Sequence, residues 1–516
     1  MKKKMIFSII LFSSILIQMK TVHAVEVDSI KGKDRYETAC MIAQKMNYTQ
    51  AILVNGYSIV DGLSASGLSG TMDSPILLTE KDSIPEKTLN ALNGVNKVYL
   101  VGGDGVISKN VERILNIKGI ATERLGGADR YSTSIAVANK IESTKGVQQI
   151  FYVNGDIGQA DAMSISPVAA KSKNPVILTN GISTAYRRNV DSYTIGGTGV
   201  LGAWFDTFTT RLGGKSRFET NKEVIDYFFQ NKQHVYLSKS EELIDALTSS
   251  VMKEPVVLID DYSDKTVMAG ARSATSLGDI SSIAISQAKG YIYQEKVVFY
   301  SQHQDDETLF AGSAIVDAIE SVGRENVYLV VVSDGDESGV FNGDRYKKLT
   351  VTEKATLRNN ELKAADEQLG LDINNIIFLN EPESNCNYDD LSKKALEFES
   401  KFTNVTHVAH TYKFDIHPQH LKCGQTIYNL YKEGKIKDCK FFARSEKANE
   451  INRNNLIVNI AYTNEQKDKI LNASKEYKLD RKDMIREGIG YKSVPSLFDA
   501  LEKDKYVTSY LHEPGI

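Results

Sequence analysis

The residues best suited to chemistry in this 516-residue chain gather in its last third. Of the eight histidines, five lie between residues 303 and 420, at His303, His407, His410, His417 and His420. Asp305 and Asp306 follow the first of them closely. Imidazole and carboxylate together are a donor set that suits zinc and other divalent metals. A catalytic zinc lowers the pKa of a water molecule to about 7, and a carboxylate that is not a ligand then takes the proton as general base. The pattern predicts a metal-hydrolase site built from His303, Asp305, Asp306 and His420.

The His-x-Asp-Asp segment has a simpler interpretation when it is taken alone. Asp306 and Glu307 at the start of a helix would cap it and stabilise its dipole without any metal. The later segment from His417 to His420 favours the metal site, because it supplies two more imidazoles after another predicted strand.

The elements expected to position these side chains form an alternating series. Lys296–Tyr300 is a short apolar strand that leads into His303, and the apolar periodicity of Leu309–Ile319 predicts a helix. Further strands and helices are predicted in turn at Asn326–Ser333, Thr352–Leu369, Asn375–Leu379, Leu391–Lys401 and Thr406–His410. Polar residues at the carboxyl end of a strand lie where open α/β sheets place their sites. The segment His417–His420 is expected in a loop beyond the last of these strands.

His407, His410 and His512 are interpreted differently. His407 and His410 fall on a predicted strand and are expected in the core or in support of the ligands. His512, near the end of the chain, is left open as an additional site residue.

The domain from about Lys296 to Phe442 resembles the PIG-L / LmbE-like N-acetylglucosaminyl deacetylase family. The matching segments are His303–Glu307, Ser333–Gly335, the helix with Arg358, Glu361 and Ala365 that ends in Leu369-Gly370, and His417–His420. The resemblance implies zinc, or another divalent metal, as cofactor and an N-acetylated glycan as substrate.

The same resemblance implies a role for each matched position. His303, Asp306 and His420 are implied to ligate the metal. Asp305 is implied to be the general base. His417 is implied to stabilise the oxyanion or to protonate the leaving amine.

Two more positions match the family pattern, and two depart from it. Arg358 and Asp334 are implied to contact substrate, although Arg358 could equally be a scaffold residue. Gln304 stands where the family has proline, which predicts a looser turn, and Gln419 stands where it has aspartate. The missing carboxylate is expected to have oriented His417. Loss of such support can cost ten- to a hundredfold in affinity or activity, so an altered substrate or a reduced rate is expected.

The first part of the chain repeats itself three times. The repeats begin near Lys31, Leu125 and Leu212, and each carries an arginine followed by an aromatic residue. Apolar strands alternate with helices, which predicts parallel sheets covered by helices. The third repeat is expected to close with a strand at Ile283–Ser286. The arginine–aromatic pair is interpreted as a structural tie, with ligand contact as the alternative.

The repeats resemble the cell-wall-binding repeat type 2 family. The signature Leu-Gly-Gly-x-x-Arg-Tyr/Phe, Val-Asn-Gly and Val-Gly-Gly recurs in register between about Val27 and Tyr293. The resemblance implies non-covalent anchoring to an anionic cell-wall polymer. The expected fold is therefore α/β: three tandem wall-binding repeats with parallel sheets, then a Rossmann-like deacetylase domain. The predicted boundaries are 1–24 for a signal peptide, 27–120, 121–208 and 209–293 for repeats 1 to 3, 295–445 for the deacetylase domain and 446–516 for its C-terminal extension.

The N-terminal residues and the net charge indicate where the protein is located and which partners are excluded. Lys2–Lys4 and the apolar run Met5–Met19 predict a secretory signal peptide cleaved after Ala24. The alternative, a membrane anchor, is disfavoured because the run is shorter than the ~20 residues that span a bilayer. The formal net charge of −4 gives no electrostatic reason to expect nucleic acid as a partner. The protein is expected to be secreted and attached to the cell wall, with no stable membrane span after cleavage.

The four cysteines, Cys40, Cys386, Cys423 and Cys439, show no paired framework, so free thiols are expected, with a Cys423–Cys439 bridge as the alternative.

Two functions remain in view. The first is a wall-anchored, zinc-dependent N-deacetylase acting on an N-acetylglucosamine-containing glycan. The second is a non-catalytic surface-layer or adhesion protein with a degenerate deacetylase domain, suggested by the two glutamines.

Overall fold

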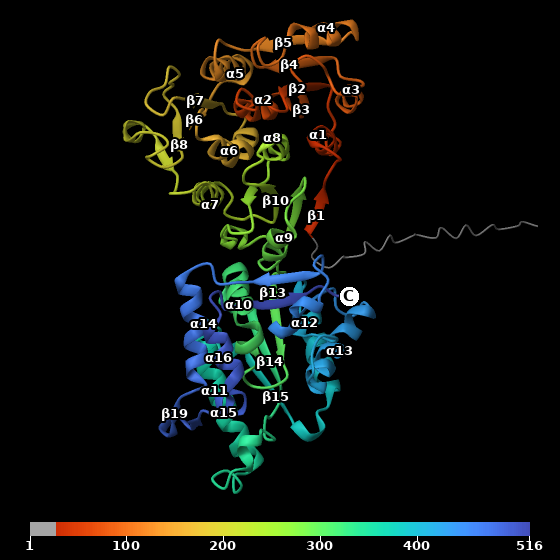
Figure 1. The fold of residues 1–516 in the computed structure, drawn as a ribbon, viewed down its shortest axis with the longest axis vertical. Helices are drawn as coiled ribbons and strands as arrows, with labels where there is room; N and C mark the ends of the chain where they lie inside the picture. The colour runs from red at the N-terminus through yellow and green to blue at the C-terminus, as the bar shows by residue number, and fades with distance from the viewer. Residues whose placement is uncertain (1–26) are drawn as a thin grey trace, which may run out of the picture.

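The computed structural model describes residues 27–516, so the predicted signal peptide lies outside the described residues. The repeats form the upper body in Figure 1, and the C-terminal domain (residues 295–516) forms the lower one. Sheets of mainly parallel strands, covered by helices, make up both bodies, which confirms the predicted α/β class. No helix of the described residues is long and apolar enough to cross a membrane.

Each repeat is built around a four-stranded parallel sheet. The first sheet has the order β3-β2-β4-β5, with β2 (Gln50–Asn55), β3 (Ile76–Thr79), β4 (Lys97–Val101) and β5 (Ala121–Leu125). The second has the order β7-β6-β8-β9, with β6 (Gln149–Asn154), β7 (Val176–Thr179), β8 (Asp191–Ile195) and β9 (Thr210–Leu212). The third has the order β1-β12-β10-β11, with β1 (Val27–Ile30), β10 (His234–Lys239), β11 (Val256–Ile259) and β12 (Ser273–Leu277).

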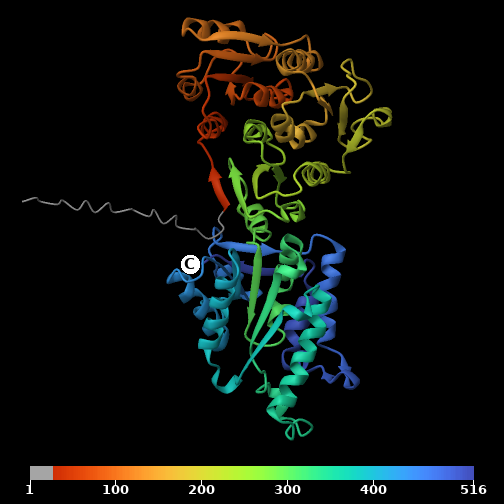
Figure 2. The ribbon, with the colours of Figure 1, turned by 180° about the vertical axis from the view of Figure 1, so that it is seen from behind.

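The strands cross the boundaries of the sequence repeats. Strand β1, from the start of the described chain, pairs with β12 of repeat 3, with Val27 opposite Ala274. In the same way β5 and β9, at the starts of repeats 2 and 3, pair with β4 and β8 of the preceding repeat. Each repeat therefore completes the sheet of another, and the three close into one body (Figure 2).

The helices of the repeats fall into equivalent sets. Helices α1 (Arg35–Ala43), α5 (Arg130–Lys145) and α7 (Arg217–Phe228) begin at the arginine–aromatic pair. Helices α2 (Ala65–Met72), α6 (Gln159–Ser172) and α8 (Ile244–Ser249) follow the second strand of each repeat, while α3 (Glu86–Ala91) and α4 (Lys109–Ile117) occur in repeat 1. At the α2–α6 contact a Cβ on Gly70 would lie 1.8 Å from the Ala170 carbonyl oxygen, so only glycine permits this approach.

The strand predicted at Ile283–Ser286 is wrong. These residues belong to helix α9 (Ser282–Lys289), whose first backbone N–H groups donate to the Ser281 hydroxyl. The closing strand is β12, in which Ser273, Thr275 and Ser276 interrupt the apolar run that marks the other strands.

The C-terminal domain has one seven-stranded sheet with the order β15-β14-β13-β16-β17-β21-β18. Its strands are β13 (Lys296–Ser301), β14 (Val327–Ser333), β15 (Ile376–Glu381), β16 (Val405–His410), β17 (Asp438–Ala443), β18 (Leu456–Asn459) and β21 (Ser509–His512). The first five are parallel, β21 runs antiparallel to β17, and β18 pairs antiparallel with β21. The covering helices are α10 (Asp306–Val322), α11 (Val351–Leu369), α12 (Tyr388–Lys401), α13 (Pro418–Lys432), α14 (Asn464–Glu476), α15 (Ile489–Ser493) and α16 (Pro495–Lys503). A hairpin of β19 (Asp480–Arg481) and β20 (Arg486–Glu487) stands apart from this sheet.

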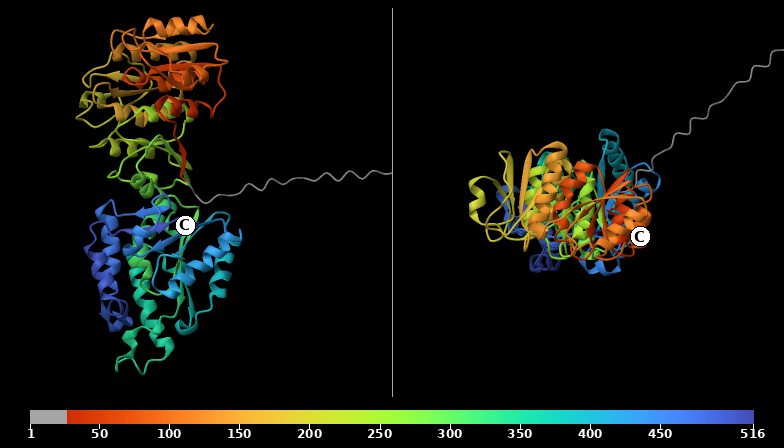
Figure 3. Two further views of the ribbon diagram at one scale, coloured as in Figure 1. Left: turned by 45° about the vertical axis from the view of Figure 1, so that its right-hand side comes forward. Right: turned by 90° about the horizontal axis from the view of Figure 1, so that it is seen from above.

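The two bodies meet without a linker (Figure 3), because α9 continues through a buried Tyr291–Tyr293 segment into β13. The buried Lys440 ammonium donates to the carbonyl oxygens of Lys289 at 2.9 Å and Ile292 at 2.6 Å. Lys289 pairs with Glu513 at 2.9 Å. These buried bonds fix repeat 3 to the amino ends of the strands of the C-terminal sheet.

All four cysteines are free thiols, and the Cys423–Cys439 bridge is not formed.

Candidate functional site

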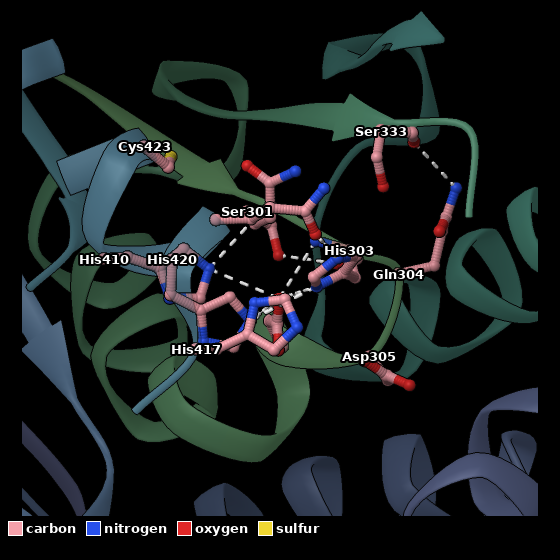
Figure 4. Close-up of polar contacts among 12 residues, drawn as sticks. Ser301, His303, Gln304, Asp305, Ser333, His410, His417, His420 and Cys423 are labelled. Carbon is pink, nitrogen blue, oxygen red and sulfur yellow. Dashed lines mark hydrogen bonds and ion pairs between the residues drawn. The ribbon is translucent and has the colours of Figure 1, made fainter. Parts of the chain in front are cut away.

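The carboxyl ends of β13 and β16 bring the predicted site residues together (Figure 4). His303 follows β13, Asp306 is the first residue of α10, and His410 ends β16. His420 lies in the first turn of α13, which begins at Pro418, so the predicted loop is in fact a helix N-terminus. Proline suits this position because its missing N–H would have no partner there.

Three atoms of the predicted ligands lie at nearly equal distances from one another. His303 Nδ1 is 3.2 Å from His420 Nε2, and both nitrogens are 3.3 Å from Asp306 Oδ2. Ligands about 2.0 Å from a tetrahedral zinc are separated by about 3.3 Å. Two imidazoles and one carboxylate at this spacing therefore fit a divalent ion.

The neighbouring His410 supports this group. Its Nε2 accepts the Gln302 backbone N–H at 3.1 Å and lies 3.3 Å from Asp306 Oδ2. Burial and the nearby His420 charge lower the pKa of His410 to about 4, so it is neutral at physiological pH. Its ring stacks on that of His420, with centroids 4.2 Å apart.

His420 is held from behind by Asp415, a residue that the sequence did not single out. Asp415 Oδ2 is 3.0 Å from His420 Nδ1, and Asp415 Oδ1 accepts the His417 backbone N–H at 2.8 Å. Although burial opposes it, the Asp306 and Asp415 carboxylates raise the pKa of His420 to about 9. A carboxylate behind a ligating imidazole fixes its tautomer and orientation.

Asp305 points away from the imidazoles and pairs with Arg358. Both terminal nitrogens of the buried guanidinium lie 3.2 Å from Asp305 Oδ2, and one also donates to the Gln304 carbonyl oxygen at 2.5 Å. The Asp305 backbone has φ of +118°, a region that a side-chain-bearing residue occupies only under strain. Burial raises the pKa of Asp305 well above its usual range, against the opposing charge of Arg358.

The structure corrects the expectation about Gln304 and gives Gln419 a contact that the sequence did not predict. Gln304 is buried, and its amide donates to the Ser333 carbonyl oxygen at 3.2 Å and to Asn359 Oδ1 at 2.8 Å, so the turn is tied down rather than loosened. Gln419 does not support His417. Its Oε1 lies 3.0 Å from His303 Nε2, and its amide donates to the Glu383 carbonyl oxygen at 2.7 Å.

His417 lies beside the proposed ligands, and its ring centroid is 4.4 Å from that of His420. Burial and the His420 charge lower the pKa of His417 to about 4. Its Nδ1 is buried and has no hydrogen-bond partner among the described residues.

The remaining predicted residues lie further out. Asp334 Oδ1 accepts the backbone N–H groups of Asp336 and Glu383, both at 3.2 Å, and Asp334 is not among the residues that line the cavity. His407 is a core residue between Tyr300 and Glu399, as expected. His512 lies outside the site, where Thr411 bonds its Nε2 at 2.8 Å.

A cavity of about 190 Å³ opens beside the imidazoles. Glu383 and Arg444 lie on its polar side, and Leu309 and Phe310 supply apolar wall. The C-terminal extension closes another part of the wall with Ser493, Val494 and Leu497. Residues 446–516, which carry no chemical signature, therefore help to shape the cavity.

In the repeats, the arginine of each arginine–aromatic pair ties a loop within its own repeat. Arg35, Arg130 and Arg217 donate to the carbonyl oxygens of Gly56, Gly155 and Ser240, at 2.7, 2.7 and 2.5 Å. This geometry favours the structural interpretation of the pair.

Comparison with known families agrees with this division of the chain. Residues 29–112, 124–203 and 211–294 each match the family model of cell wall binding domain 2 (CWB2). Residues 298–431 match the family model of the GlcNAc-PI de-N-acetylases (PIG-L).

Individual relatives match parts of the chain. N-acetylmuramoyl-L-alanine amidase LytC of Bacillus subtilis (strain 168) is 25% identical over 322 residues, which cover 56% of this chain and 64% of the amidase. The structure of Cwp8 from Clostridium difficile is 28% identical, covers 51% of each chain and has a TM-score of 0.48. N,N'-diacetylchitobiose deacetylase from Pyrococcus horikoshii is 14% identical, covers 40% of this chain and 77% of that chain, and has a TM-score of 0.30. The chain thus spans less than two thirds of the length of LytC and about half that of Cwp8.

Proposed function

The chain joins three cell wall binding repeats to a PIG-L deacetylase domain, and we propose on this basis that it is a secreted, wall-attached N-deacetylase. Its substrate is an N-acetylglucosamine-containing glycan, and its cofactor is zinc or another divalent metal. The observation that carries the proposal is the triangle of His303 Nδ1, Asp306 Oδ2 and His420 Nε2, with sides of 3.2, 3.3 and 3.3 Å. These three residues would hold the ion, which when bound would polarise the amide carbonyl and lower the pKa of water.

The chain's own residues divide the remaining work. Asp305 is the general base and takes a proton from the attacking water. Arg358, with both terminal nitrogens 3.2 Å from Asp305 Oδ2, holds that carboxylate in one orientation. The backbone strain at Asp305 keeps its side chain out of the ligand cluster, so the base and the ligand Asp306 point in different directions although they are neighbours.

His417 is the residue placed to act on the scissile group. Its ring lies beside both proposed imidazole ligands, with centroids 5.0 Å from His303 and 4.4 Å from His420. From there it stabilises the oxyanion as the carbonyl is attacked, or passes a proton to the leaving amine. The apolar wall of Leu309 and Phe310 suits the methyl group of the acetamide.

Anchoring is the proposed role of the repeats. An anionic cell-wall polymer is their partner, and attachment is non-covalent. Export through the predicted signal peptide would bring the protein to that wall.

The alternative of a degenerate, non-catalytic domain rested on Gln304 and Gln419. Both side chains are hydrogen-bonded inside the site, and Gln419 holds a proposed metal ligand. These contacts support the catalytic proposal over that alternative.

The test is acetate release from chitin oligomers by purified protein loaded with zinc. We expect turnover that a chelator stops and that added zinc restores. Zinc binding without acetate release from any N-acetylated wall glycan would favour the non-catalytic alternative. Absence of bound metal after zinc loading would refute the site itself.

A further inference from the structure

Repeats 1 and 2 share one scaffold around the loops that follow β4 and β8. In repeat 1 an Arg124 terminal nitrogen donates to the Gly102 carbonyl oxygen at 3.0 Å, and the guanidinium pairs with Glu112 at 3.0 Å. In repeat 2 Arg211 does the same with the Gly196 carbonyl oxygen at 2.7 Å and with Asp206 at 2.7 Å. Since Gly102 corresponds to Gly196 and Glu112 to Asp206, the positions between them correspond one to one.

On this shared scaffold the two repeats present different surfaces. Trp204, the only tryptophan of the chain, occupies the position that corresponds to Asn110 of repeat 1. It is 44% exposed in the short 3-10 helix η2 (Ala203–Thr207), and its ring contacts Phe205 and Phe208 with centroids 5.1 and 4.9 Å apart. In repeat 1 the corresponding asparagine lies in the first turn of α4, so a repeat can fold without an indole at this position.

A positive charge without a partner lies against this aromatic surface. The Arg187 guanidinium is 3.8 Å from the centroid of the Phe208 ring and 5.7 Å from that of Trp204. Arg187 is exposed and forms no ion pair within residues 27–516. The adjacent Arg188 is neutralised by Glu142, at 2.7 Å through each of two nitrogens. The charge of Arg188 is thus neutralised within the protein, whereas the Arg187 guanidinium can bind a ligand.

The segment that carries Arg187 is also particular to repeat 2. Between β7 and β8 residues 180–190 form no helix, whereas repeat 1 has α3 between the corresponding strands. In Figures 1 and 2 the yellow segments on either side of β8 lie on the outer flank of the repeat body. The surface is therefore accessible from the side.

We propose that Trp204, Phe208 and Arg187 form a binding subsite for an anionic polysaccharide. The C–H face of a pyranose ring packs on the exposed indole, and the free guanidinium nitrogens donate to a phosphate or carboxylate on the same glycan. A protein partner fits less well, because one indole and one cation fall far short of the roughly 1,000 Å² that a specific protein interface buries. This inference rests on the proposed anchoring role and assigns part of it to one flank of repeat 2.

The single tryptophan supplies a direct reporter. Full-length protein is titrated with a phosphodiester-linked glycan extracted from Gram-positive cell walls, with polygalacturonate, and with neutral dextran. We expect a saturable change in Trp204 emission with the first two and none with dextran, and their relative affinities distinguish phosphate from carboxylate recognition. Arg187→Gln should weaken binding at least tenfold, whereas Arg113→Gln, which removes an exposed arginine from repeat 1, should leave it unchanged.

Sedimentation with purified cell walls separates this inference from the proposed function. If wild-type protein binds walls but Arg187→Gln and Trp204→Ala bind equally well, anchoring stands and the subsite is refuted. An emission change with dextran equal to that with the anionic glycans would refute the role of charge. If wild-type protein binds neither walls nor anionic glycans, the anchoring proposal fails and the subsite fails with it. If Trp204 emission changed only on addition of another protein and with none of the glycans, the partner of this surface would be a protein and the glycan subsite would be refuted.

Discussion

Gln419 Oε1 lies 3.0 Å from His303 Nε2, so the side chain at position 419 holds the first proposed metal ligand rather than the neighbouring His417. The same amide donates to the Glu383 carbonyl oxygen at 2.7 Å. Gln419 thereby connects the start of α13, the turn after β13 and the loop before α12.

Replacing Gln419 tests this connection. Gln419→Ala removes the acceptor that fixes the His303 tautomer, and we expect zinc affinity to fall about tenfold. Competition with a fluorescent zinc chelator measures the change. Gln425→Ala, on the exposed face of the same helix, is the matched control. Equal zinc affinity in all three proteins would show that Gln419 does not support the ligand.

Asp415 makes the corresponding contact with the other imidazole ligand. Asp415→Asn replaces a carboxylate that accepts two hydrogen bonds with an amide that can accept at only one of its two atoms. We expect zinc affinity to fall ten- to a hundredfold while the fold is kept. Isothermal titration with zinc is the measurement, and Asp389→Asn, at an exposed position of α12, is the control. Unchanged affinity would contradict the positioning role.

Asp305 should matter for turnover and not for the metal. Asp305→Asn keeps the size of the side chain and suits the positive φ, because asparagine tolerates the left-handed region better than most residues. We expect acetate release to fall about 10²–10⁴-fold with zinc content unchanged. If zinc is lost together with activity, Asp305 is a ligand and not the base.

The repeats carry a pH-dependent stability term at Asp161. Burial in α6 raises the pKa of Asp161 to about 7, above its usual value near 4. The folded repeat therefore holds this proton more tightly than the unfolded chain does. Its contribution to stability is complete below about pH 4 and is lost as the pH rises to about 7. Asp161→Asn should match wild type near pH 4 and exceed it by up to about 4 kcal/mol above pH 7.

Urea unfolding followed by Trp204 emission measures this effect within repeat 2 itself. Asp156→Asn, at an exposed carboxylate of the same repeat, should show no such pH dependence. A constant stability difference between Asp161→Asn and wild type across this pH range would exclude a raised pKa at Asp161.

The junction between the two bodies depends on Lys440. Lys440→Met leaves the carbonyl oxygens of Lys289 and Ile292 without their donor, at a cost of about 1–3 kcal/mol for each buried group. We expect earlier cleavage near Tyr291–Tyr293 in limited proteolysis. Lys437→Met, at an exposed lysine three residues earlier, should be cleaved like wild type. If Lys440→Met is cleaved no earlier than Lys437→Met, contacts other than those of Lys440 hold the junction.

The α/β class, the repeats and the grouping of His303, Asp306 and His420 could be predicted from the sequence. Each depends on a regular pattern: apolar strands in alternation with helices, and parallel strands whose carboxyl ends meet at one edge of a sheet. Strand β1 could not be recognised, because Val27–Ile30 is four residues long and its partner β12 lies nearly 250 residues further on.

The supporting residues of the site depend on loop conformation instead. Asp415 stands five residues before His420, but only the turn into α13 brings its carboxylate behind that ring. The contact between Gln419 and His303 could not be predicted, because a helical first turn directs the Gln419 side chain toward His303 while a loop would not. A search for acidic residues close to the ligand motif would have found Asp415 but not its contact with His420.

The absence of a linker between α9 and β13 has a spatial consequence. The repeats contact the C-terminal domain at the amino ends of its parallel strands. The cavity opens at the carboxyl ends of those strands, so the repeats and the cavity lie at opposite ends of the C-terminal domain. A molecule attached to a surface through its repeats would hold the cavity at a constant distance from that surface. The cavity would then reach only substrate that lies at one distance from the surface to which the repeats bind. Inserting a flexible segment after Tyr293 would widen that range of distances.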